Sequence, residues 1–162
     1  MAENSKDARL NDLEKRTSDR GFLIFAKEYY DAYEIIQNNN PATTKYFAVK
    51  YYLLCHALEL VMKALLRNYG ETYTQLKAYR HDLAKLEKAP YHKYQIAVDP
   101  TSSINIRLVN ELYSNKEFEY YLRGMKHVPE ITALARITSL MIGKARFQII
   151  LGGDPRKLRG SG

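Results

Sequence analysis

The stretch that decides the fold is residues 51–66, which read YYLLCHALELVMKALL. In a helix, this stretch places apolar side chains on almost every side, and a helix of that kind belongs in the centre of a bundle. The apolar pattern begins near residue 43, and Gly70 can adopt the left-handed conformation that often follows the end of a helix. The sequence therefore predicts a central helix over residues 43–68.

Apolar periodicity typical of helices continues on both sides of this segment. Over residues 21–37 apolar side chains recur at helical spacing, and three asparagines followed by Pro41 end the pattern. After a turn over residues 71–80, further helices are expected to begin at Asp82, at Ser102 or Ser103, and at Pro129. The predicted fold is all-α, an up-and-down bundle of four to five helices over residues 21–153. Residues 1–20 are expected to form a charged N-terminal tail, and residues 154–162 a C-terminal tail.

The chain of 162 residues carries 25 Lys and Arg against 18 Asp and Glu, a formal charge of +7. The excess gathers in residues 121–162, which hold eight cations and two anions. Such a segment can bind phosphate groups, or it can be an ordinary solvated surface. Residues 1–20 lack the apolar run of a signal peptide, and no segment approaches the roughly 18 apolar residues of a membrane span. A cytoplasmic protein without membrane contact is therefore expected.

A polar stripe interrupts the predicted central helix. It consists of His56, Glu59, Lys63 and Arg67, which share one helical face because they follow one another at spacings of three and four. The stripe can be the part of the helix that reaches water, or a polar seam that faces a neighbouring helix. In the second case His81, at the start of the next helix, is the natural partner, and the seam can bind a ligand. These residues match no metal-ligand spacing, so neither a metal nor a cofactor is predicted.

Residues 51–66, followed by HDLAKL at residues 81–86, resemble the core of the HEPN superfamily, the higher eukaryotes and prokaryotes nucleotide-binding domain. Arg80 stands where the family pattern often has glycine. The resemblance implies a helical bundle, usually a homodimer, in a superfamily tied to RNA and nucleotides. It also implies a role in a toxin-antitoxin or defence system, in some members beside a partner protein of nucleotidyltransferase type.

Many HEPN proteins are metal-independent ribonucleases with an Arg and a His separated by four to six residues. The nearest pair in this chain is Arg123 and His127, which have three residues between them. In such an enzyme the His acts as acid or base, and the Arg offsets phosphate charge in the transition state. The resemblance therefore leaves a metal-independent endoribonuclease as one alternative.

Three functions are open from the sequence. The first is a noncatalytic HEPN-like module that binds a nucleotide, RNA or protein partner through His56, Glu59, Lys63 and His81. The second is the ribonuclease that uses Arg123 and His127. The third is a purely structural dimeric assembly protein, in which the 14 tyrosines supply the half-buried contact surface.

Overall fold

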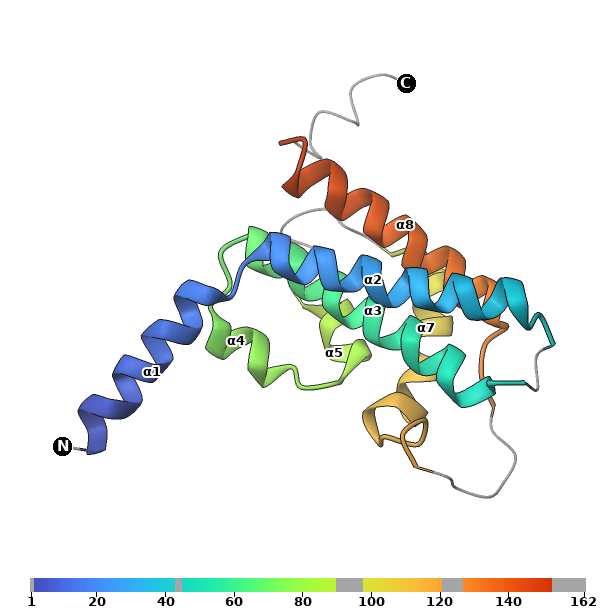
Figure 1. Cartoon of the computed structure of the whole chain (residues 1–162), viewed down its shortest axis with the longest axis horizontal. Coiled ribbons are helices and arrows are strands. Elements are labelled where there is room, and N and C mark those ends of the chain that lie inside the picture. The colour runs from blue at the N-terminus through green and yellow to red at the C-terminus, as the bar shows by residue number, and fades with distance from the viewer. Residues whose placement is uncertain (1, 43–44, 90–97, 121–126, 153–162) are drawn as a thin grey trace.

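The computed structural model describes residues 2–42, 45–89, 98–120 and 127–152, and it is helical (Figure 1). The helices are α1 (Ala2–Arg16), α2 (Asp19–Asn39), α3 (Phe47–Asn68), α4 (Tyr73–Ala78), α5 (Leu83–Lys88), α7 (Pro100–Ser114) and α8 (Ile131–Ile149). No strand occurs in these four ranges, so the predicted all-α class is confirmed. None of the helices described here combines the length and the apolar character that crossing a bilayer requires.

Helix α3 is the centre of the structure, as its apolar pattern predicts. It packs along α2, which runs beside it in the opposite direction, and it also contacts α8, α5, α4 and α7 (Figure 1). Leucines on several sides of α3, including Leu54, Leu58 and Leu65, are fully buried. Gly70 follows with a φ of +99°, which confirms the predicted left-handed turn after the helix.

A buried lysine fastens α3 to the end of α2. Lys50 lies in the first turn of α3 and has no exposed surface. Its Nζ donates to the carbonyl oxygen of Asn40 and to that of Ala42, the latter over 3.1 Å. A cation beside the last carbonyl groups of a helix interacts favourably with the helix dipole. Lys50 therefore holds the chain as it leaves α2.

Two local predictions need correction. The expected turn over residues 71–80 contains a short helix, α4, which Thr72 and Gln75 begin with reciprocal hydrogen bonds. The next long helix, α7, is capped by Asp99, whose carboxylate accepts from the Ser102 backbone N–H over 3.0 Å, and not by Ser102 or Ser103. Proline at the first helical position favours this earlier start, because its fixed φ suits a helix and it has no N–H to leave unpaired.

The charged residues 1–20, expected above to form a tail, contain α1 and the start of α2. Figure 1 shows α1 extending away from the bundle beside α4. Arg67 of α3 holds the C-terminal end of α1 in place. The Arg67 guanidinium pairs with the Glu14 carboxylate and donates to the Thr17 carbonyl over 3.1 Å. The second Glu14 oxygen accepts from the Tyr73 backbone N–H over 2.6 Å. One ion pair thus joins α1, α3 and α4.

Candidate functional site

Glu59 is the centre of a buried polar cluster on α3. Its side chain is only 3% exposed. Oε1 accepts from Lys63 Nζ over 2.6 Å, and Oε2 accepts from the Tyr113 hydroxyl over 2.6 Å and from His81 Nδ1 over 3.0 Å. A buried carboxylate is stable only when its oxygens are paired in this way. We call this group the Glu59 cluster. It consists of Glu59, Lys63, His81, Tyr113 and His56, whose contacts are described next.

The hydrogen bonds define the tautomers of the two histidines. An ionised carboxylate only accepts, so the His81 ring carries its proton on Nδ1. The Tyr113 hydroxyl gives its proton to Glu59 and therefore accepts from His56 Nδ1 over 2.9 Å. In each ring, Nε2 is therefore the nitrogen left for a further hydrogen bond. None of the described residues forms a hydrogen bond with either Nε2.

Aromatic rings hold the histidines in place. The His56 ring meets Tyr29 edge-on, with centroids 4.4 Å apart, and stacks on Tyr52 at 5.6 Å. The His81 ring meets Tyr113 edge-on at 6.0 Å. These contacts come from α2, α3 and α7, so the packing of three helices sets the ring orientations. The two rings differ in access to water, because the His56 side chain is 18% exposed and that of His81 is 46% exposed.

A left-handed residue positions His81. Arg80, where the HEPN pattern often has glycine, has a φ of +52°, the conformation that glycine adopts without strain. The Arg80 carbonyl accepts from Lys63 Nζ over 2.9 Å, so Lys63 ties this turn to the cluster. The chain then enters α5, where the Asp82 carboxylate caps the helix by accepting from the Lys85 N–H over 3.0 Å, as predicted.

The predicted seam comes together in part. His56, Glu59, Lys63 and His81 meet in one cluster, and Glu59 and Lys63 are buried, so the stripe is not a strip of α3 that simply faces water. Arg67 does not join them and pairs instead with Glu14. Tyr113, which sequence reasoning missed, bridges His56 to Glu59. Whether the cluster binds a ligand stays a prediction.

The alternative pair, Arg123 and His127, falls partly outside the described residues, because Arg123 lies in the range 121–126. His127 is described and exposed.

Within the four described ranges, no three His, Cys, Asp or Glu side chains are arranged to hold a metal ion. Both Glu59 oxygens accept hydrogen bonds from Lys63, Tyr113 and His81, so each oxygen already has a partner within the protein.

The surroundings of Glu59 and His56 shift the pKa of each group. Burial raises the pKa of Glu59, but the Lys63 ammonium and the hydrogen bonds it receives outweigh burial and hold that pKa below its ordinary value of 4.5. Burial lowers the pKa of His56 below its ordinary value of 6.5, and the attraction of Glu59 offsets this only in part. Glu59 is therefore ionised and His56 neutral at pH 7.

We expect the protein to lose stability as the pH falls from 7.5 to 5.5, in part because of His56. The unfolded chain binds a proton at this histidine near pH 6.5, whereas the folded chain binds it only at lower pH, so acid favours unfolding. Glu59 adds a loss of the same sign below about pH 4.5. Urea denaturation at the two pH values measures the effect.

The variant His56→Phe keeps a ring against Tyr29 and Tyr52 but cannot titrate. Its free energy of unfolding should change less between pH 7.5 and 5.5 than that of the wild type. His127→Phe, at an exposed position, should retain the wild-type pH dependence. An unchanged pH dependence in His56→Phe would contradict the assignment.

Comparisons with protein-family models, with curated proteins and with solved structures find no match for this chain.

Proposed function

We propose that the protein is a noncatalytic, HEPN-like module that binds RNA or a nucleotide at the exposed end of the Glu59 cluster. The observation that carries the proposal is the geometry of His81. A buried carboxylate holds its Nδ1, nearly half of its side chain is exposed, and no described residue bonds its Nε2. Nε2 of His81 is therefore available to a ligand.

A nucleotide carries the chemical groups that fit this end of the cluster. With its proton on Nδ1, His81 can accept a hydrogen bond at Nε2 from a ribose hydroxyl or a base amino group, while Nδ1 keeps its bond to Glu59. Arg80 directly precedes His81 and is exposed. Lys85 is also exposed, but its ammonium pairs with the Asp82 carboxylate over 3.3 Å. The Arg80 charge attracts a polyanion without specifying its sequence. The buried ion pair of Glu59 and Lys63 keeps the histidine oriented.

The resemblance of residues 51–66 and 81–86 to HEPN proteins also supports binding of RNA or a nucleotide. It further leads us to expect a particular oligomeric state. We propose a homodimer, as is usual in that superfamily, acting in a toxin-antitoxin or defence system. Exposed apolar side chains on α2, namely Ile24 and Phe25, offer surface for such a contact.

Single-stranded RNA labelled with fluorescein tests the proposal. We expect binding that weakens with salt at a log-log slope of about −0.7 for each phosphate contacted. In His81→Asn the amide nitrogen can replace Nδ1 as the donor to Glu59, but nothing replaces Nε2. This variant should keep its fold and bind RNA about tenfold more weakly, which corresponds to the loss of about one hydrogen bond.

His127→Asn is the matched control and should bind RNA like the wild type, because His127 is exposed and lies outside the Glu59 cluster. Competition by unlabelled ATP distinguishes a nucleotide site from one that needs an RNA chain. Absence of RNA and ATP binding at low salt would refute the proposal. RNA cleavage in EDTA that disappears in His127→Asn would favour the ribonuclease instead.

A further inference from the structure

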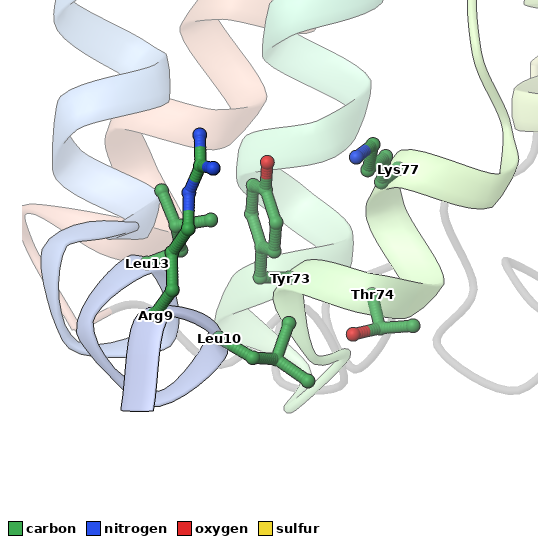
Figure 2. Close-up of a pocket in the computed structure, with 6 residues that line it drawn as sticks. All are labelled: Arg9, Leu10, Leu13, Tyr73, Thr74 and Lys77. Atoms are coloured by element: carbon green, nitrogen blue, oxygen red, sulfur yellow. The ribbon is translucent and has the colours of Figure 1, made fainter. Parts of the chain in front are cut away.

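A groove separate from the Glu59 cluster lies between α1 and α4. This groove is open to solvent and has a volume of about 520 Å³, within the usual range of ligand sites. Each helix contributes three side chains at the spacing i, i+1, i+4, so each presents one face (Figure 2). The lining residues are Arg9, Leu10, Leu13, Tyr73, Thr74 and Lys77.

The corner at which the two helices meet is firmly held. The Glu14 carboxylate, one residue after the last α1 lining residue, accepts from the backbone N–H of Tyr73, the first residue of α4. Arg67 neutralises this carboxylate and also donates to the Glu71 carbonyl over 2.8 Å. The groove is therefore preformed, which reduces the conformational entropy that the protein loses when a ligand binds.

The groove carries unpaired positive charge above an apolar floor. Arg9 and Lys77 lie on opposite walls, and neither forms an ion pair with a described residue. In the view of Figure 2, the Tyr73 hydroxyl lies between the guanidinium and the ammonium groups. Leu13 is half-buried, whereas Leu10 is 42% exposed, so apolar surface is open to a ligand. Among the described residues, no carboxylate lines the groove.

We propose that the groove between α1 and α4 docks an acidic amphipathic helix of a partner protein. A carboxylate of that helix lies between Arg9 and Lys77, and an apolar side chain one turn away covers Leu10 and Leu13. Charge complementarity favours an acidic partner and disfavours the basic C-terminal residues 154–162 of this chain. The two leucines favour a peptide over a nucleic acid, because a phosphate backbone does not bury apolar side chains.

A labelled alanine-based helical peptide with Leu and Glu one turn apart serves as the probe. We expect saturable binding that Arg9→Glu/Lys77→Glu weakens about tenfold or more. The control Lys15→Glu/Lys88→Glu makes the same change in net charge at exposed sites outside the groove and should bind normally. A peptide with Lys in place of Glu should bind the Arg9→Glu/Lys77→Glu protein better than the wild type.

Circular dichroism of both double variants checks that they fold. His81→Asn should bind the peptide normally, so this inference can fail or succeed independently of the proposed RNA site. Three outcomes would overturn the inference. They are no binding to the wild type, equal binding of a peptide with Ala in place of Leu, and self-association by sedimentation that Arg9→Glu/Lys77→Glu abolishes. The last outcome would make a second copy of the chain the occupant.

Discussion

Replacing Glu59 with alanine is expected to lower the free energy of unfolding by about 3 to 5 kcal/mol. Glu59 is buried and receives hydrogen bonds from three side chains, including the 2.6 Å bond from the Lys63 ammonium. The substitution leaves that ammonium, which is itself 11% exposed, with only the Arg80 carbonyl as a partner. Removal of one member of a buried ion pair is costly because the remaining charge keeps its desolvation penalty.

A double substitution separates the ion pair from simple loss of packing. Glu59→Ala/Lys63→Met removes both charges and keeps an unbranched side chain at position 63. It should recover much of the stability lost in Glu59→Ala, because apolar residues often replace a buried ion pair without loss. Glu28→Ala, at an exposed position on α2, should change the free energy of unfolding by less than about 0.5 kcal/mol.

Urea denaturation at pH 7.5 measures all of these variants. A loss below about 1 kcal/mol in Glu59→Ala would mean that water reaches Lys63 and that the cluster is not the buried network described. RNA binding by the folded Glu59→Ala protein reports separately on His81, because that ring loses the carboxylate that holds Nδ1.

The Glu59 cluster shows which parts of a site can be predicted from sequence. His56, Glu59 and Lys63 share a helical face, so their spacing alone brings them together. His81 was predicted to join them because it lies at the start of the next helix, α5, which packs against α3. Tyr113 could not be predicted, because 54 residues separate it from Glu59 and a tyrosine on an amphipathic helix usually indicates ordinary core packing. Only the packing of α7 against the other helices places its hydroxyl.

Two helices of the structure, α1 and α4, were not predicted, and only one of them has a recognisable signal in the sequence. The beginning of α4 can be read from Thr72 and Gln75, which match the capping-box pattern. Helix α1 has no such signal, because Leu10 and Leu13 form too small an apolar stripe among charged residues. Its position depends on contacts that Arg67 makes across 53 residues of chain, and residue spacing does not show these.

The burial of Lys50 is a further feature that residue patterns do not reveal. A lysine in an apolar segment suggests a point where the helix reaches water, since Lys is almost never fully buried unless it is paired. Here the partners are backbone carbonyl groups of Asn40 and Ala42, which every residue possesses and which sequence patterns therefore do not reveal. The prediction of α3 as the central helix holds because its many buried apolar side chains outweigh this one charge.

Replacement of Leu65 with alanine tests that central position directly and should lower the free energy of unfolding by about 2 to 5 kcal/mol. Leu65 has no exposed surface and lies on α3, which contacts α2, α8 and α5. Helices on several sides cannot all move inward to fill the space of the lost side chain, so a cavity remains and adds to the loss of apolar burial.

The matched control for Leu65→Ala is Ile35→Ala on α2, which also removes part of a large aliphatic side chain. Ile35 is 64% exposed, so its truncation leaves no cavity and should cost less than about 0.5 kcal/mol. In urea denaturation, Leu65→Ala should lower the midpoint without changing the slope, because both proteins expose similar surface on unfolding. Equal losses in the two variants would show that α3 is not more deeply packed than α2, and the bundle would need a different centre.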